Sequence, residues 1–192
     1  MATGMWIVNP NDAAAEYDGL EDRRVAVVCQ PNTALALRNY GVGQELAERV
    51  SAKLGKNIDG VEMVPQSEIN DWTDQHQLKS ISEFGKAMNA DVVVAINLPE
   101  FRLYSGKSMM RGEATAEVEV HDIATGELLH ELEAIDSLYP PENGIPIELS
   151  NQRSSETRFR RKYLGVLADQ ISRRFYAHDS RQAVKMDRFY KE

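Results

Sequence analysis

The sequence predicts an α/β fold, a three-layer-like mixed sheet in which parallel βαβ units are followed by an antiparallel meander and a long C-terminal helix. Two observations support this fold class. Three short runs rich in β-branched residues are separated by helical patterns, which is typical of parallel strands joined by helical crossovers. Residues 112–121 instead alternate strictly between apolar and polar types, as an antiparallel strand does when one face meets water.

The first half of the chain supplies the parallel part. Its expected strands are continuous apolar runs, at residues 24–30, 61–64 and 91–97. Its expected helices lie at residues 42–56, 67–73 and from 80 onward. The first helix has an apolar residue at every fourth position: Val42, Leu46, Val50 and Leu54. The third begins with Ser80 three residues before Glu83, which is the spacing of a capping box.

The second half supplies the meander and the last helix. Phe101 and Leu103 alternate with polar residues ahead of the strand at 112–121, and a Thr125-Gly126 turn leads into a further strand at 127–135. Three prolines within residues 139–146 predict an irregular loop, because proline disrupts both helices and strand ladders. A long helix is expected over residues 155–178, with an apolar face made of Phe159, Tyr163, Val166, Leu167, Ile171 and Phe175.

These patterns place a single α/β domain at residues 24–178. Residues 1–23 have no apolar period and predict a flexible N-terminal arm, and residues 179–192 predict a polar C-terminal tail. The single cysteine excludes an intramolecular disulfide and a cysteine-rich zinc or iron–sulfur site. No apolar run approaches the roughly 20 residues that a membrane-spanning helix needs.

The net charge of −8 conceals an asymmetry. Residues 1–150 hold 11 Lys and Arg against 25 Asp and Glu, a net −14, whereas residues 151–192 hold 11 against 5, a net +6. Such a division marks either a tail that binds nucleic acid or anionic lipid, or a basic helix that pairs with its own acidic domain. We favour pairing within or between subunits, because glutamates line the wet faces of the antiparallel strands and like charges opposite one another are unfavourable.

No motif assigns a catalytic or cofactor-binding residue. Gly41-Val42-Gly43 begins like a dinucleotide fingerprint, but the third glycine would fall at Leu46. Cys29 ends an apolar strand, where a free thiol is normally a small apolar side chain. We therefore expect no cofactor and no enzymatic activity.

The candidate metal ligands also fail to form a set. Asp71 and Asp74 share one helix face, whereas His76 points away from it, so we expect no metal site. One enzymatic alternative is left open. In α/β sheets a site forms beyond the carboxyl ends of the parallel strands, which here lie near residues 30–32, 65–67 and 97–100.

The residues expected to contact a partner lie in two places. Met109 and Met110 form an apolar pair at the tip of the first antiparallel hairpin. The long helix adds basic residues, namely Arg158, Arg161, Lys162, Arg173 and Arg174. They predict a surface for a protein partner or for self-association. The alternative is a cytoplasmic module that binds nucleic acid or nucleotides through the basic helix, although no aromatic-interleaved RNA motif accompanies it.

Several stretches carry a resemblance to known proteins. They are the strands at 24–28 and 91–96, the helix at 42–54, and the strand at 114–120 followed by Asp122-Ile-Ala-Thr-Gly-Glu127. Over residues 23–178 the chain resembles a group of bacterial envelope proteins. The group includes the periplasmic domain of the curli secretion channel, the N-terminal domain of the Tol translocation protein, and lipoprotein activators of peptidoglycan synthases. Residues 9–20 and Tyr139-Pro140-Pro141 look like uncharacterised envelope lipoproteins of the same group.

The resemblance implies a non-enzymatic domain that acts by binding and assembly in the periplasm or at the outer membrane. It further implies a lipoprotein whose lipid-bearing cysteine would precede residue 1, and hence attachment to a membrane through that lipid. Residues 101–116 lack the long insertions that could form membrane strands, so a pore of the curli type is not expected.

Overall fold

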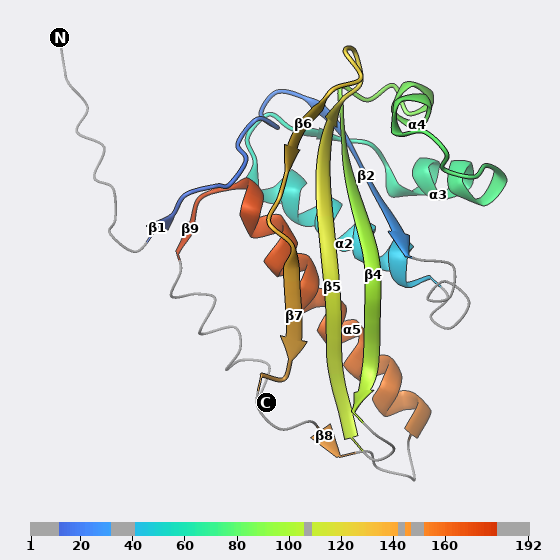
Figure 1. The fold of residues 1–192 in the computed structure, drawn as a ribbon, viewed down its shortest axis with the longest axis vertical. Coiled ribbons are helices and arrows are strands. Elements are labelled where there is room, and N and C mark those ends of the chain that lie inside the picture. The colour runs from blue at the N-terminus through green and yellow to red at the C-terminus, as the bar shows by residue number, and fades with distance from the viewer. Residues whose placement is uncertain (1–11, 32–40, 106–108, 142–144, 147–151, 180–192) are drawn as a thin grey trace.

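The computed structural model describes residues 12–31, 41–105, 109–141, 145–146 and 152–179. Seven strands form one mixed sheet in the order β3-β2-β4-β5, and β6, β7 and β8 all pair with β5 (Figure 1). These strands are β2 (Arg24–Pro31), β3 (Glu62–Met63), β4 (Val92–Ser105), β5 (Met109–Asp122), β6 (Leu128–Glu131), β7 (Ile135–Tyr139) and β8 (Ile145–Pro146). The helices are α2 (Val42–Asn57), α3 (Gln66–Gln75), α4 (Ile81–Ala87) and α5 (Gln152–Ser172). The predicted α/β class is confirmed.

The parallel part follows the sequence prediction closely. β2 pairs in parallel with β3 on one side and with β4 on the other. The predicted apolar face of α2 is correct, since its four apolar residues, Val42, Leu46, Val50 and Leu54, are all buried. The predicted cap is also correct, because the Ser80 hydroxyl accepts the Glu83 N–H at 3.3 Å ahead of α4.

β4 is longer than the sequence predicted. The expected strand at 91–97 and the separate alternating stretch around Phe101 are one strand of 14 residues. Its register against β5 shifts between Asn97 and Glu100, so that Leu98 and Phe101 both face the core. This irregularity resets the apolar alternation inside a continuous strand, which is why the sequence pattern looked interrupted.

The antiparallel part departs from prediction at two points. The strand expected at 127–135 is divided into β6 and β7, which lie end to end along β5. The loop expected at 139–146 is wrong in part, because Tyr139 ends β7 and β8 pairs with Met109 and Met110 of β5. Proline is tolerated in β8 because an edge strand needs no ladder hydrogen bonds on its outer side.

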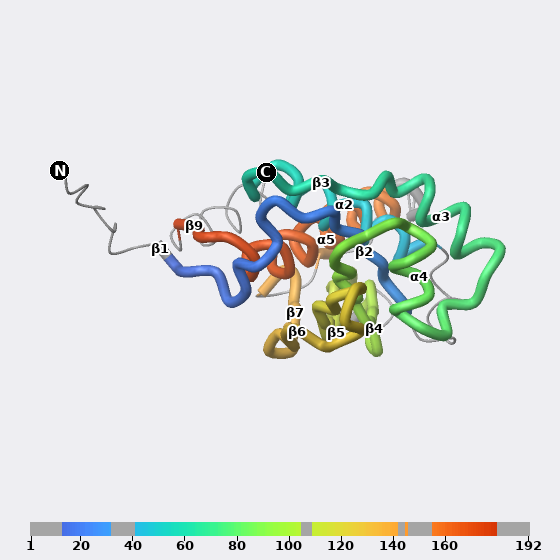
Figure 2. Tube along the Cα trace, turned by 90° about the horizontal axis from the view of Figure 1, so that it is seen from above, coloured from blue at the N-terminus to red at the C-terminus, as the bar shows by residue number. Residues whose placement is uncertain are grey.

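Helices cover the two faces of the sheet unequally. α2 and α5 pack on one face and form the main core with β2, β4, β5 and β7. On the other face α3 and α4 cover only the part near β2 and the first half of β4, where they enclose a second, smaller core (Figure 2). The rest of this second face has no helix over it among the described residues.

The last helix is shorter than predicted. The helix expected over 155–178 ends at Ser172, and a 3-10 turn at Arg173–Phe175 (η2) and a short strand, β9 (His178–Asp179), follow it. Phe175 is buried in the main core, so its apolar position was predicted correctly although the helix had already ended.

The segment before β2 contacts the domain. β1 (Asp12–Ala13) pairs antiparallel with β9, so the two ends of the described chain lie side by side. Leu20 is fully buried, and the N–H groups of Glu16 and Tyr17 donate to the Arg174 carbonyl oxygen at 2.7 and 3.1 Å. Residues 12–20 are therefore packed, although we expected them in a flexible arm. The division into arm, domain and tail stays a prediction, and residues 1–11 and 180–192 lie outside the described residues.

None of the helices in the described ranges is long and apolar enough to span a membrane.

Candidate functional site

The half of the sheet that α3 and α4 leave uncovered is acidic. Side chains alternate between the two faces along β4, β5 and β7, and many of the outward positions carry polar residues. We use the term acidic sheet face for the six carboxylates that point outward there: Glu100, Glu113, Glu117, Glu119, Glu131 and Asp136. Among the described residues, the arginines on the same face are Arg102 and Arg111. The surface potential is therefore negative.

Some of these carboxylates are held by neighbours on the adjacent strand. Arg102 forms ion pairs with Glu100 and with Glu113, the latter at 3.8 Å. The Asn97 side-chain amide donates to Glu117 at 2.6 Å, and the Thr115 hydroxyl donates to Asp136 at 2.9 Å. Apart from Arg102 and Glu100, which both belong to β4, these pairs join neighbouring strands, and on an exposed sheet each contributes little to stability.

One pair on this face is unfavourable. Glu119 and Glu131 lie directly opposite each other on β5 and β6, and like charges in this position repel. His121 lies 2.8 Å from Glu119. The register therefore does not separate these two glutamates, and the basic helix does not cover them within one subunit, because α5 packs on the opposite face of the sheet.

The basic residues of α5 are only partly paired within the chain. Arg160 forms an ion pair with Glu45 of α2 at 3.1 Å. Arg174 forms one with Glu16 at 2.9 Å. Arg158 and Arg161 are exposed, and the described residues provide no ion-pair partner for them.

The basic residues expected in one partner surface occupy two places. Lys162 is half-buried, and desolvation lowers its pKa. It lies near Arg158 and Arg161, whereas Arg173 and Arg174 follow the end of the helix, about 20 Å further along at 1.5 Å per residue. Arg173 and Arg174 instead line a cavity of about 570 Å³ beside β1 and the start of β7. The five residues therefore do not form one patch.

The methionine pair is also divided by the fold. Met110 is 4% exposed and belongs to the main core, whereas Met109 is half-buried. Both pair with β8 through the backbone. Met110 is thus a core residue rather than part of an exposed apolar pair.

An exposed apolar surface does exist, at the edge of the sheet. Within the described ranges, four large apolar side chains are exposed, and all of them lie on the short strands that border β5. They are Leu128 (49%) and Leu129 (37%) of β6, Leu138 (38%) of β7 and Ile145 (38%) of β8. We call these four residues the apolar sheet edge. Sequence reasoning missed this edge, although Leu138 occupies an outward position between the inward Ser137 and Tyr139.

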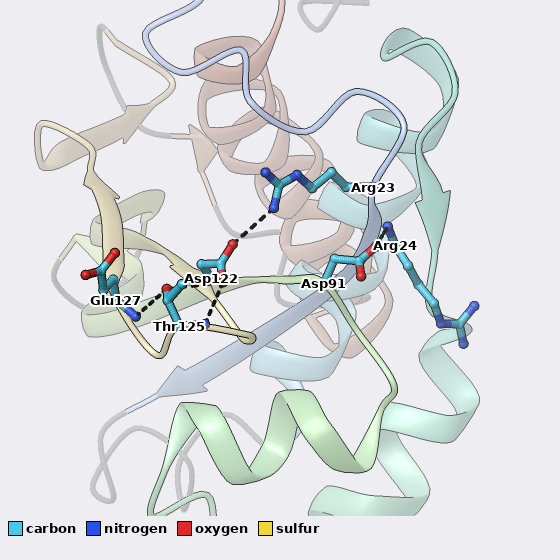
Figure 3. Close-up of polar contacts among 6 residues, drawn as sticks. All are labelled: Arg23, Arg24, Asp91, Asp122, Thr125 and Glu127. Atoms are coloured by element: carbon cyan, nitrogen blue, oxygen red, sulfur yellow. Dashed lines mark hydrogen bonds and ion pairs between the residues drawn. The ribbon is translucent and has the colours of Figure 1, made fainter.

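Three of the stretches that carry the resemblance meet at the amino end of β4 (Figure 3). They are the strands at 24–28 and 91–96 and the turn at 122–127. A carboxylate oxygen of Asp91 accepts the Arg24 N–H at 2.8 Å, and the Asp91 N–H donates to the Arg24 carbonyl oxygen at 2.8 Å. Asp122 accepts the Thr125 N–H at 2.9 Å and the Arg23 guanidinium at 3.1 Å. The Thr125 bond is the main reason that the pKa of Asp122 lies below its ordinary value.

The other contacts within residues 122–127 close the turn between β5 and β6. The Thr125 hydroxyl accepts the Glu127 N–H at 3.2 Å, and Gly126 adopts a left-handed conformation with φ of +76°. The Gly126 N–H donates to the Asp122 carbonyl oxygen at 2.9 Å. These residues fasten β2, β4 and β5 to one another, so the motifs are accounted for by the fold.

The carboxyl ends of the parallel strands border a cavity of about 730 Å³. Gln30 and Pro31 of β2, Gln66 of α3 and Asn97 of β4 line it, so the three segments named from the sequence do converge. Cys29 also lines it, and burial raises the pKa of its thiol to about 12. The thiol is therefore protonated near neutral pH and is a poor nucleophile.

The acidic and imidazole groups considered as metal ligands have other contacts. Asp74 accepts the Gln44 side-chain amide at 3.3 Å. The His76 ring stacks on Trp72 with a centroid separation of 4.8 Å, and its Nδ1 lies 3.0 Å from the Trp72 carbonyl oxygen.

No family model matches this chain, and no curated protein matches its sequence. Solved structures similar to it include the PelC dodecamer from Paraburkholderia phytofirmans, with 14% identity, coverage of 80% of this chain and 89% of that chain, and a TM-score of 0.46. Lipoprotein GNA1162 from Neisseria meningitidis has 12% identity, coverage of 78% and 97%, and a TM-score of 0.45. The LpoB C-terminal domain from Salmonella enterica has 15% identity, coverage of 64% and 89%, and a TM-score of 0.42. Bacterial lipoproteins, the group that the sequence resembles, are thus represented among the similar structures.

Proposed function

We propose that the protein is a non-enzymatic interaction domain of the bacterial cell envelope that binds a protein, either a partner or a second copy of itself, through the apolar sheet edge. The observation that carries this proposal is the location of the exposed apolar side chains. All four large ones among the described residues lie on β6, β7 and β8, at a single border of the sheet. The exposed side chains are spread along this border, from Leu128 opposite His121 to Ile145 opposite Met110 of β5, as a surface for an extended segment would be.

The backbone at this border favours the same function. β7 pairs with β5 on one side, and no described strand pairs with its other side. An edge strand presents unpaired N–H and C=O groups, to which an extended segment of another chain can add as a further strand. Leucines at positions 128 and 138 would then contact apolar side chains of that segment.

The flanking charges indicate the composition of the segment. Asp136 and Glu131 lie on the exposed face next to the edge, and Glu113 is the direct cross-strand partner of Leu138. A segment with apolar residues on one face and Lys or Arg on the other would therefore fit better than an acidic one.

The envelope location and the lipid anchor rest on the resemblance of the sequence to envelope lipoproteins. Both are tested by expressing the intact native gene and fractionating the cells. We expect the protein in the membrane fraction with a lipidated N-terminal cysteine. A cytoplasmic, unmodified product would contradict this part of the proposal while leaving the binding edge to be tested separately.

Binding of nucleic acid through α5 is the weaker alternative. Arg160 and Arg174 are engaged by Glu45 and Glu16, so only part of the basic run is available to phosphates. Salt-dependent binding of a polyanion that is lost in the Arg158→Glu, Arg161→Glu variant would favour this alternative.

The binding edge is tested by placing a photo-crosslinking amino acid at position 138 in the native host, with position 71 on the exposed surface of α3 as the control. The protein captured at 138 is then purified, or the chain itself is used if it captures a second copy. Its affinity is measured for the natural chain, for Leu138→Asp and for the matched control Ser67→Asp, which adds the same charge on α3. We expect Leu138→Asp to weaken binding at least tenfold, which corresponds to about 1.4 kcal/mol.

Two results would contradict the proposal. Equal capture at positions 138 and 71 would show that the edge has no preferred partner. Equal affinity of Leu138→Asp and Ser67→Asp would show that the captured protein binds elsewhere.

A further inference from the structure

We propose that the cavity at the carboxyl end of β2, beside Asn97 of β4, binds a small saccharide, neutral or anionic, through the carboxamide side chains that line it. The cavity shares no residue with the apolar sheet edge, so this inference is independent of the proposed function. Its volume of about 730 Å³ falls within the range of small-molecule sites.

The position of the cavity follows from the topology. β2 is followed by α2 on one face of the sheet, whereas β3 is followed by α3 on the other face. The two helices diverge beyond the end of β2 and leave a crevice between them, which is where ligands of open α/β sheets bind. Gln44 and Ala47 of α2 form one wall, and Asn70 and Thr73 of α3 form the opposite wall.

The lining is unusually rich in carboxamides. Six of the side chains that border the cavity are amides: Gln30, Gln44, Gln66, Asn70, Gln77 and Asn97. Among the described lining residues there is no carboxylate, and the ionisable groups are Cys29, His76 and Lys79. Such a surface offers hydrogen bonds without negative charge.

Hydrogen bonds within the protein determine how three of these side-chain amides are oriented. Their nitrogens donate to a carbonyl or a carboxylate: Gln30 to the Leu78 carbonyl oxygen at 3.1 Å, Gln44 to Asp74 at 3.3 Å and Asn97 to Glu117 at 2.6 Å. Because those partners can only accept, the amide nitrogen must face them, and the amide oxygen and the second N–H of each nitrogen remain for a ligand. The Gln66 nitrogen donates to the Asn70 side-chain oxygen at 3.3 Å, and Gln66 Oε1 is buried with no hydrogen-bond partner in the described part of the chain.

Acceptor oxygens together with the remaining N–H donors suit a ligand with several hydroxyl groups, since a hydroxyl both donates and accepts. Hydroxyl groups and ammonium groups both donate, but the positive charge of Lys79 and the absence of a lining carboxylate disfavour an ammonium. Leu78, which is half-buried, supplies apolar surface against which the C–H face of a sugar ring can pack. Lys79 can also pair with a carboxylate on the ring, so an acidic sugar fits as well as a neutral one.

The test is a titration of the ¹⁵N-labelled full chain followed by NMR, because the side-chain NH₂ groups of the lining amides give their own resonances. The probes are glucose, N-acetylglucosamine and glucuronic acid, with glucosamine as the cationic counterpart. We expect at least one of the first three to shift the NH₂ resonances of the cavity amides, and glucosamine to bind at least tenfold more weakly.

Matched variants locate the site. Gln30→Ala removes one lining amide from an exposed position, and Gln75→Ala removes an exposed glutamine of α3 that does not line the cavity. We expect Gln30→Ala to weaken binding of the effective sugar about tenfold and Gln75→Ala to leave it unchanged, provided that the backbone spectra show both variants folded. The inference is overturned if none of the three sugars moves a cavity resonance, if the two variants bind equally well, or if glucosamine binds as tightly as the other sugars.

Discussion

Replacing Gly112 by alanine should destabilise the domain by displacing one buried aromatic ring. A Cβ atom at this position would lie 2.4–2.6 Å from three ring carbons of Tyr163, closer than non-bonded carbons can approach. Tyr163 cannot move away easily, because it is fully buried and stacks on Phe101 with a centroid separation of 5.6 Å. Its hydroxyl also donates to the Ser137 carbonyl oxygen at 3.1 Å.

Two effects contribute to the magnitude. Forcing an extra methyl group into a packed core costs about 1–3 kcal/mol. Displacing the ring far enough to break the bond from Tyr163 to Ser137 adds about 1 kcal/mol, because the carbonyl oxygen stays buried. We therefore expect a loss of about 3 kcal/mol in the free energy of unfolding. With a urea dependence of about 2 kcal/mol per M, the unfolding midpoint should fall by about 1.5 M.

The assay is urea unfolding followed by circular dichroism. Gly55→Ala is the matched control, because its Cβ would meet only the flexible Met63 side chain, at 3.0 Å, and alanine favours the helix by about 1 kcal/mol. A second experiment introduces Gly112→Ala into the Tyr163→Leu variant. There we expect the substitution to lower the free energy of unfolding by less than about 1 kcal/mol. The reasoning is refuted if Gly112→Ala costs less than about 1 kcal/mol in the natural chain, or the same in both backgrounds.

Three further predictions concern single side chains. Leu46→Asp places a carboxylate in the fully buried contact between α2 and the sheet and should abolish the folded far-UV circular dichroism spectrum, whereas Glu48→Asp on the exposed side of the helix should not. The lowered pKa of Asp122 means that its carboxylate stabilises the folded state at neutral pH, and that this contribution is lost as the pH falls through the folded-state pKa. The stability difference between the natural chain and Asp122→Ala, measured by urea unfolding, should accordingly shrink below pH 3.8; a constant difference would contradict the assignment. The pKa of Cys29, raised to about 12, predicts alkylation by iodoacetamide at pH 8.5 that is about 10³-fold slower in the native protein than in urea, and equal rates would contradict it.

The elements that the sequence predicted well are those whose pattern is set by local packing. The apolar period of α2 and the capping box of α4 depend on neighbours three or four residues away, and both were placed correctly. The errors in strand boundaries occur where one strand pairs with several others. β5 pairs with β6, β7 and β8 in turn, so the breaks between these three strands follow the register along β5 and leave no clear mark in their own sequences.

The candidate site was harder to predict because it depends on contacts distant in sequence. The pairing of Arg160 with Glu45 joins residues 115 positions apart, and no local pattern distinguishes Arg160 from Arg161 beside it, which has no ion-pair partner among the described residues. Met110 was taken for a surface residue because the hairpin tip was expected next to it, yet it shares the inward face of β5 with Gly112 and Ala114 and lies in the core. The cavity beside Gln30 and Asn97 was located correctly although β4 continues beyond Asn97, because the position of a crevice follows from βαβ topology alone.

The charge distribution argues that the uncovered face is kept for contact rather than for stability. A cation opposite Glu119 would stabilise the pairing of β5 and β6, but Glu131 lies there and costs about 0.2–1 kcal/mol instead. The basic helix that could neutralise this face packs behind the sheet, where its Arg160 pairs with Glu45 and Arg174 of the following 3-10 turn pairs with Glu16. Acidic and basic surfaces are thus held apart by the sheet itself, so the charge that one subunit leaves unpaired is available to attract an oppositely charged partner. An association that depends on this charge should weaken as salt is added, whereas contact through Leu128 and Leu138 alone should not.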